Sequence, residues 1–404
     1  MKISDMRLVD YADRRFRLAG REVLGHVRHF MGSFDRLSAE SRNGSVVSFG
    51  NYDYLGLAAD KRVREAAADA ALRIGVGVSA SRMIGGERDF HAAFEAEIAA
   101  FVGTEACLCL VSGYLTNMTL VGHLLGSRDL LLIDELSHNS IVTGASGSRA
   151  RTIAFRHNDL DHLEEILRIE RKAHARCLIV VEGLYSMDGD VPDLPRLLAM
   201  KQAHDSWLMV DEAHSVGVLG ATGRGLSEHW GTDPREIDLI VGTLSKSFVS
   251  CGGFIAADAR VLEWLHFTLP GFVFSVGMAP PIAAAAGAAL RILREEPWRI
   301  ARLHAISQHF VSEAERLGLD IGPSIGHGVV PVFFRDNAET VACAEAMLAQ
   351  GFYCPPIVQV GVPRDQPRLR FFLSVQHREQ DVTAALEIVA AARMTLRQPA
   401  VAAS

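Results

Sequence analysis

The sequence has no long hydrophobic run and no excess of positive charge. None of its apolar segments approaches the roughly 18 consecutive residues that a membrane-spanning helix needs. The 404 residues carry a formal net charge of -7, so no basic surface for nucleic acid is expected. Residues 1–20 alternate charges with single apolar residues and lack the apolar core of a secretory signal. We therefore expect a cytoplasmic protein without integral membrane contact and without a nucleic-acid partner.

Cysteine is scarce and scattered. The six cysteines are Cys107, Cys109, Cys177, Cys251, Cys343 and Cys354. Their spacing matches neither a zinc site nor the disulfide framework of a secreted domain. We expect no metal site and predict buried thiols.

The order of apolar and helical segments predicts the fold class. Between about residues 60 and 256, short apolar runs alternate with helical stretches such as 91–101 and 160–173, which indicates α/β with a mostly parallel sheet. The predicted strands are 107–111, 130–133, 177–181, 208–210, 239–241 and 254–256.

The chain divides into three predicted parts. Residues 1–55 form an N-terminal helical segment, with amphipathic periodicity over 5–30, and residues 56–285 form the large domain. From about residue 281 the sequence is alanine-rich and helical, and alternating runs follow at 329–334 and 369–374. We predict a smaller α+β domain over 286–404.

Two polar residues at predicted strand ends are the most informative. Asp211 ends the apolar run 207–210, and Lys246 follows the run 239–241. In parallel sheets, ligands bind at the carboxyl ends of the strands. Pyridoxal phosphate needs this pair, because a lysine amine holds its aldehyde as a Schiff base and a carboxylate keeps its ring nitrogen protonated. The sequence predicts a pyridoxal-phosphate enzyme.

Hydroxyl groups and a glycine turn predict the phosphate site. Ser112, Gly113 and Tyr114 follow a strand and precede a helix, where backbone N–H groups can bind an anion. Thr243 and Ser245 beside the lysine add hydroxyl donors. Capping of the next helix is the alternative role for these side chains.

Two histidines and a serine are candidates for the ring of the cofactor. His214 lies three residues after Asp211, and Ser186 lies in the segment 185–190; both are placed to bind the phenolic oxygen. His138 follows another strand and offers a flat ring that can stack on pyridoxal and act as an acid.

Arg370 is the candidate for binding a substrate carboxylate. A guanidinium provides two parallel donors for a carboxylate, and Arg370 lies in the alternating run 369–374. The alternative is an outward-facing arginine on a strand. Once an amino acid replaces Lys246 on the cofactor, the freed amine is a natural base for the Cα proton.

These motifs together resemble the α-oxoamine synthases, which are pyridoxal-phosphate enzymes of fold type I. The resemblance runs from about Phe49 to Asp381 and rests on motifs in the same order. They are residues 53–57, 112–114, 137–140, 182–190, 211–214, 243–246 and 368–370. The segment 77–82 looks closer to serine-palmitoyltransferase-like and polyketide-associated members than to 8-amino-7-oxononanoate synthase.

The resemblance implies both a reaction and an assembly. Members condense a small amino acid (glycine, alanine or serine) with an acyl thioester of coenzyme A or acyl-carrier protein, releasing carbon dioxide and thiol. His138 would then polarise a carbonyl. Sites of this family lie at a homodimer interface, and Ser275 looks like the hydroxyl that reaches the phosphate of the neighbouring subunit.

One departure concerns substrate binding. Many members carry asparagine just before the Tyr-Leu-Gly of the first motif, where it helps to hold the substrate carboxylate. This chain has Asp53 there and Asn51 two residues earlier. If Asp53 faced the substrate, its charge would repel that carboxylate.

Other activities remain open from the residues alone. Asp211 and Lys246 also occur in aminotransferases and carbon–carbon lyases of the same fold. A non-catalytic partner subunit that binds pyridoxal phosphate is a second alternative. A nicotinamide enzyme is disfavoured because no Gly-x-Gly-x-x-Gly follows a strand.

Overall fold

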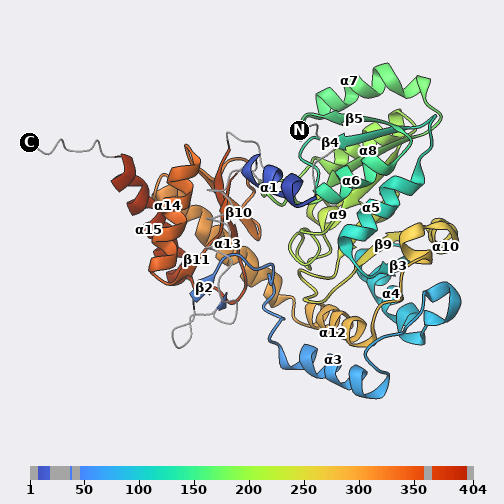
Figure 1. The fold of residues 1–404 in the computed structure, drawn as a ribbon, viewed down its shortest axis with the longest axis horizontal. Coiled ribbons are helices and arrows are strands. Elements are labelled where there is room, and N and C mark those ends of the chain that lie inside the picture. Colours follow the sequence, from blue (N-terminus) through green and yellow to red (C-terminus); the bar gives the residue numbers. More distant parts are fainter. Residues whose placement is uncertain (1–7, 19–36, 39–45, 359–365, 398–404) are drawn as a thin grey trace, which may run out of the picture.

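The computed structural model describes residues 8–18, 37–38, 46–358 and 366–397. Two lobes lie side by side, as Figure 1 shows. The described part of the predicted N-terminal helix is α1 (Leu8–Leu18); the rest of the predicted segment 5–30 falls outside the described residues. In that described part, no helix is both long and apolar enough to cross a membrane.

A seven-stranded sheet forms the centre of the large lobe. Its order is β3-β9-β8-β7-β6-β4-β5, and only β9 runs antiparallel to its neighbours. The strands are β3 (Ala106–Leu110), β4 (Leu130–Asp134), β5 (Arg151–Phe155), β6 (Cys177–Glu182), β7 (Trp207–Asp211), β8 (Leu239–Thr243) and β9 (Gly253–Ala257). All six predicted strands are therefore confirmed to within two residues. The edge strand β5 was missed, because most of its side chains are exposed and give no apolar run.

Helices cover both faces of this sheet. Alternate strand residues pack on opposite faces: Leu130 and Leu132 belong to one buried cluster, and Leu131 and Ile133 to the other. The first cluster includes α4 (Asp89–Val102), α7 (Leu160–Glu170) and α8 (Leu194–Ala203). The second includes α5 (Gly113–Leu124), α6 (Asn139–Gly147), α10 (Ala259–Thr268) and α11 (Pro270–Val273). The shorter helical elements of this lobe are η3 (Arg82–Gly86), η4 (Arg171–Ala173), α9 (Leu226–Trp230) and η5 (Pro234–Glu236).

The small lobe is α+β, as predicted. Its antiparallel sheet has the order β10-β13-β12, and a second sheet of parallel strands has the order β1-β2-β11. The strands are β1 (Leu37–Ser38), β2 (Val46–Ser48), β10 (Val329–Phe333), β11 (Phe352–Tyr353), β12 (Pro356–Ile357) and β13 (Arg368–Phe372). The helices are α13 (Trp298–Arg316), α14 (Asn337–Ala349) and α15 (Glu379–Arg397).

Two described elements make contacts across the predicted domain boundaries, and the division into three parts stays a prediction. Residue 286 falls inside α12 (Pro280–Glu295), which packs against α3 (Lys61–Arg73) in the large lobe (Figure 1). The predicted boundary at residue 286 therefore falls within a helix that packs on the large lobe. Within the predicted N-terminal segment 1–55, the described strand β2 pairs with β11 of the small lobe. Helix periodicity could not show this, since the pairing partner lies about 300 residues away in the sequence.

Candidate active site

The polar ends of the parallel strands meet around one cavity between the lobes. The cavity has a volume of about 450 Å³. Its lining includes Ser112, Gly113, Tyr114, His138, Ser186, Asp211, His214, Thr243, Ser245, Lys246 and Arg370, all predicted from the sequence. The structure thus brings together residues that are far apart in the sequence; among these predicted residues, Ser112 and Arg370 are 258 positions apart.

Asp211 and Lys246 lie in the wall of this cavity. Asp211 is buried at the end of β7, where its carboxylate accepts hydrogen bonds from Ala213 N at 2.9 Å and from Asn117 Nδ2 at 2.6 Å. Lys246 follows β8, and its Nζ lies 5.8 Å from the centre of the Tyr52 ring. Burial lowers the pKa of the Lys246 amine to about 8, although Asp211 and Glu182 oppose this shift. The neutral, nucleophilic form of the amine is therefore more populated than in an exposed lysine.

The start of α5 forms an anion cradle next to the lysine. Ser112 is the N-cap of α5, and the first backbone N–H groups of a helix have no partner within it. Gly113 allows the close approach of this turn to β8, because a Cβ there would lie 2.6 Å from Thr243 Oγ1. Thr243 Oγ1 and Ser245 Oγ lie 2.8 Å apart at the same point. Tyr114 packs at the rim, where its hydroxyl donates to Asn139 Oδ1 at 2.7 Å.

His138 is held as a hydrogen-bond donor toward the cavity. Its Nδ1 lies 2.7 Å from Ser140 Oγ and accepts from Ser140 N at 3.3 Å, while its backbone N–H donates to Glu182 Oε1 at 2.6 Å. Burial lowers the pKa of His138, so the ring is neutral at physiological pH. With Nδ1 accepting, the ring proton lies on Nε2.

His214 has a similar arrangement. Its Nδ1 lies 2.7 Å from the hydroxyl of Tyr54, which is fully buried. Burial lowers the pKa of His214 well below its ordinary value and raises that of Tyr54. The phenol therefore donates and the imidazole accepts at Nδ1, which leaves a proton on His214 Nε2. A donor at this position suits an anionic ligand oxygen.

Arg370 brings a positive charge from the small lobe to this cavity. Its Nη1 donates to Ser186 O at 3.0 Å, and its guanidinium lies 4.5 Å from the centre of the Phe372 ring. Its buried Nε has no hydrogen-bond partner, and in the described part of the chain no carboxylate forms an ion pair with it. Burial lowers the pKa of this guanidinium. A half-buried, incompletely paired cation at a cavity wall is a site for an anion.

These residues fit pyridoxal phosphate. The cavity is large enough for a cofactor with a small substrate, and it combines a helix N-terminus with hydroxyls, a buried carboxylate and a lysine of lowered pKa. Ser112, Gly113, Thr243 and Ser245 would hold the phosphate, Asp211 the ring nitrogen, and Lys246 the aldehyde carbon. The described residues contain no group of three or more side chains placed to hold a metal ion.

Several predicted residues lie elsewhere. The carboxylate of Asp53 accepts from Leu57 N at 2.8 Å and Ala58 N at 3.0 Å, so it caps a turn and does not line the cavity. The structure does not bring this carboxylate to the cavity, and its substrate contact stays a prediction. Asn51 is exposed and also does not line the cavity.

Two further predictions fall at or beyond the edge of the site. Ser275 is half-buried outside the cavity of its own chain, and its reach into a neighbouring subunit stays a prediction. Five of the six cysteines are buried as predicted, but Cys251 is exposed and lines the cavity. Cys251 follows the turn that begins at Lys246. Its exposure results from the backbone path of that turn, which the sequence does not show.

Four residues of the site were given no individual role from the sequence, although Glu182 lies in the strand-end motif 182–190 and Tyr54 in the motif 53–57. Asn117 and Tyr54 hold Asp211 and His214 in place, Glu182 binds the backbone of His138, and Tyr52 forms part of the cavity wall. Burial and the nearby Asp211 raise the pKa of Glu182 to about 8. Glu182 ends strand β6 and was within reach of the strand-end argument. Asn117 lies inside a helix, where nothing in the sequence marks it.

The comparison with known proteins identifies the family of this chain. The family model for aminotransferase class I and II matches residues 45–389. An 8-amino-7-oxononanoate synthase of Saccharophagus degradans is 36% identical over 88% of this chain and 89% of its own length. A serine palmitoyltransferase of Bacteroides thetaiotaomicron is 34% identical over 85% of this chain and 86% of its own.

Solved structures give the same result. The serine palmitoyltransferase of Sphingomonas wittichii superposes with a TM-score of 0.87 at 28% identity, over 96% of this chain and 99% of that chain. A structure of SPT with PLP gives a TM-score of 0.83, also at 28% identity, over 87% and 88% of the two chains. Fold and site thus define a pyridoxal-phosphate-dependent enzyme of fold type I. The chain belongs to the α-oxoamine synthases, within the aminotransferase class I and II family.

Proposed function

We propose that this protein condenses a small amino acid with an acyl thioester and releases carbon dioxide and free thiol, giving an α-amino ketone. A carbon–carbon bond forms between Cα and the acyl carbon, the acyl C–S bond and the bond from Cα to its carboxylate break, and one proton is taken up. The observation that carries the proposal is the placement of Lys246, Asp211, His138 and the incompletely paired Arg370 around one cavity. The names of the relatives support the same reaction.

The cofactor supplies electron withdrawal, and the protein supplies charge and proton placement. When bound, pyridoxal phosphate condenses with amines and withdraws electrons from the carbon that bears the amine. Asp211 would hold the ring N–H⁺, because its carboxylate is already fixed by Ala213 and Asn117. This fixation leaves little reorganisation to be made during the reaction.

Arg370 and Lys246 act on the amino acid. The guanidinium of Arg370 binds its carboxylate and so fixes the orientation of Cα. Lys246 Nζ then takes the Cα proton, for which a pKa of about 8 suits an amine that must be neutral near physiological pH.

His138 acts on the acyl group. Its Nε2–H can donate to the thioester carbonyl oxygen, where negative charge develops as the new carbon–carbon bond forms. The neighbouring Ser140 and Glu182 fix the ring and its backbone. His138 thus polarises the electrophile without changing its own charge.

A direct assay tests this proposal. Purified holoenzyme is incubated with glycine, alanine or serine and with coenzyme A or acyl-carrier-protein thioesters of graded chain length. We expect stoichiometric release of thiol and of carbon dioxide from the amino-acid carboxylate. Amino-group transfer to a keto acid, without thiol release, would instead identify an aminotransferase and overturn the proposal.

We also propose that the working form is a cytoplasmic homodimer. Apolar side chains are exposed in two segments that meet, since Gly277 N donates to Ala80 O at 3.0 Å. The exposed fraction is 88% for Ile84 and 87% for Phe274. Ser275 lies beside Phe274, so covering this surface would bring it to the partner. A molar mass of twice 44.0 kDa by light scattering is expected; a monomer that retains full activity would contradict it.

A further inference from the structure

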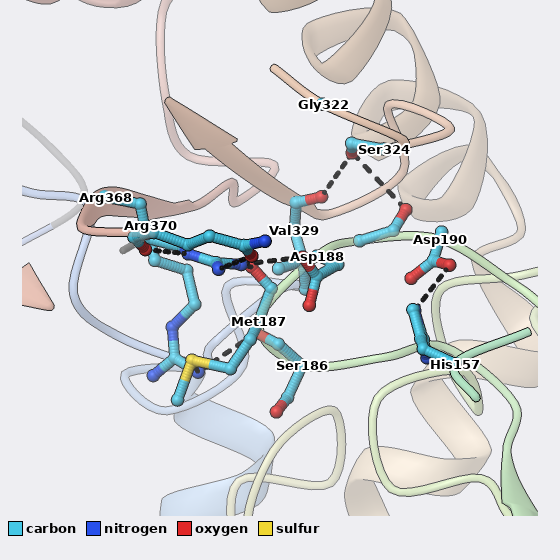
Figure 2. A network of polar contacts seen from close by, with 12 residues as sticks. His157, Ser186, Met187, Asp188, Asp190, Gly322, Ser324, Val329, Arg368 and Arg370 are labelled. Carbon is cyan, nitrogen blue, oxygen red and sulfur yellow. Dashed lines mark hydrogen bonds and ion pairs between the residues drawn. The ribbon is translucent and has the colours of Figure 1, made fainter. Parts of the chain in front are cut away.

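A turn at residues 185–190 connects the two lobes. Tyr185 N donates to Asp190 O at 3.0 Å, and Gly189 N donates to Tyr185 O at 2.8 Å, so the turn is closed on itself. It follows β6 of the large lobe and contacts β10 and β13 of the small lobe (Figure 2). Its first polar side chain, Ser186, lines the active-site cavity.

Two arginines of β13 bind consecutive residues of this turn. Arg368 Nη1 donates to Asp188 Oδ1 at 2.7 Å and to Met187 O at 3.0 Å. Arg370 Nη1 donates to Ser186 O at 3.0 Å and contacts Met187 Sδ at 3.2 Å. The two arginines are two residues apart on one strand, so both side chains project from the same face of the sheet.

The two guanidinium groups differ in how they are satisfied. Arg368 is fully buried at 0% exposure; besides Asp188, it donates to Gln366 O at 3.1 Å and to Gln366 Oε1 at 3.0 Å and stacks on Phe333, 4.3 Å from the ring centre. Arg370 instead keeps an unpartnered buried Nε at the cavity. The hydrogen bonds of Arg368 therefore fix the turn, whereas Arg370 still has a donor with which it can bind a ligand.

The rest of the turn is fixed from both sides. Gly189 approaches β10 so closely that a Cβ there would lie 2.3 Å from Val329 O, and Ile325 N donates to Gly189 O at 2.9 Å. On the large-lobe side, His157 lies between two carboxylates, 3.0 Å from Asp190 and 2.9 Å from Asp134. The position of residues 186–188 therefore depends on their contacts with Arg368 and Arg370.

We propose that the buried Arg368–Asp188 ion pair is a positioning element that holds residues 186–188 against β13 and thereby aims Arg370 at the substrate carboxylate. The inference deepens the proposed function and rests on it for the identity of the ligand of Arg370. If the pair is broken, Ser186 O and Met187 Sδ shift, and Arg370 loses the contacts that orient it. Displacements of this size have large effects on bound geometry.

The test compares single and double variants. Asp188→Asn, Arg368→Gln and the double variant are prepared as holoenzymes, and the dissociation constant of the amino acid is measured by absorbance titration. The KM values of amino acid and thioester and the thermal midpoint are also measured. We expect each single variant to raise the amino-acid dissociation constant and KM about tenfold or more, with the KM of the thioester changed less than about twofold. The double variant should be less impaired than either single one, because no buried charge is left unpaired.

Two controls separate positioning from general stability. Leu386→Ala removes a buried side chain of α15 and should lower the thermal midpoint without changing amino-acid binding. Ser324→Ala removes contacts to Gly189 O and Val329 O but leaves both arginines in place, and it should also leave binding unchanged.

The outcomes are decisive in either direction. If the single variants lower only the midpoint, as Leu386→Ala does, or if their effects on binding simply add in the double variant, the proposal is overturned. If Asp188→Asn does not fold, Arg368→Lys is tested in its place. This variant keeps the positive charge but lacks the parallel donors of the guanidinium. We expect a smaller loss of amino-acid affinity that is still selective for the amino acid. The binding titration needs no thioester, so it remains readable even if the wild-type protein fails to condense the two substrates.

Discussion

Replacing Arg370 by methionine should weaken amino-acid binding without destabilising the protein. In the unliganded protein this guanidinium donates to Ser186 O and stacks on Phe372, while its buried Nε has no partner. Arg370→Met removes a charge-assisted hydrogen bond worth about 1.5–3 kcal/mol and a cation–π contact worth about 0.5–2 kcal/mol. It also removes a buried Nε donor without a partner, which costs about 1–3 kcal/mol, and a half-buried charge that pairs with no carboxylate of the described residues, which costs more.

The favourable contacts that the substitution removes and the unfavourable burial that it relieves nearly cancel in the free energy of unfolding, but not in the free energy of amino-acid binding. We expect the free energy of unfolding to stay the same or rise, as is common where a binding site holds strained groups. A substrate carboxylate deprived of its buried charge partner loses about 2–5 kcal/mol, which is about 30-fold or more in the dissociation constant. The dissociation constant of Arg370→Lys should lie between those of the wild type and Arg370→Met, because lysine keeps the positive charge but lacks the two parallel donors of the guanidinium.

Denaturant unfolding and amino-acid titration of the same preparations measure both quantities. Arg378→Met is the matched control, since this arginine pairs with Asp381 and its side chain is 53% exposed; it should change neither quantity by much. The reasoning fails if Arg370→Met lowers the free energy of unfolding by more than about 2 kcal/mol and leaves amino-acid affinity intact. Arg370 would then be a structural anchor.

Three further predictions follow from the same cavity. Burial lowers the pKa of Lys246 to about 8 from 10.5, so the unfolded chain binds more protons than the folded chain between these pH values. The free energy of unfolding of the apoenzyme should therefore increase as the pH rises from about 8 toward 10.5. Denaturation curves of Lys246→Met that show the same increase would contradict this. Asp211→Asn should reduce turnover on the order of a hundredfold or more. Its free energy of unfolding should change by only about 1 kcal/mol, because Asn117 Oδ1 has no partner and can accept from the new amide after a flip; a large loss of stability with normal turnover would refute it. Tyr52→Ala removes part of the cavity wall, and kcat/KM for amino acids larger than serine, relative to glycine, should rise about tenfold; an unchanged ratio would show that Tyr52 does not limit side-chain size.

Much of the large lobe could be predicted from local patterns. Apolar runs of a few residues alternate with helical stretches, and this alternation alone indicates a parallel sheet. Since the carboxyl ends of parallel strands share one edge, Asp211 and Lys246 could be assigned to one site without coordinates. His138 and His214 could be proposed from the same strand-end argument and Arg370 from its alternating run, and the cavity lining contains all three.

Side-chain direction and long-range pairing could be decided only by the tertiary structure. Asp53 and Tyr52 are adjacent, and the sequence does not say which one faces the cavity; the turn formed by residues 53–58 directs the Asp53 carboxylate to backbone N–H groups and leaves Tyr52 in the wall. Residues 46–48 lie in the small lobe because β2 pairs with β11, a contact between segments about 300 residues apart. The sequence by itself determined which chemical groups end the strands, because a parallel strand buried on both faces appears locally as a short apolar run. The tertiary structure decided which groups are buried, paired or left free for a ligand, because burial depends on neighbours that come from other parts of the chain.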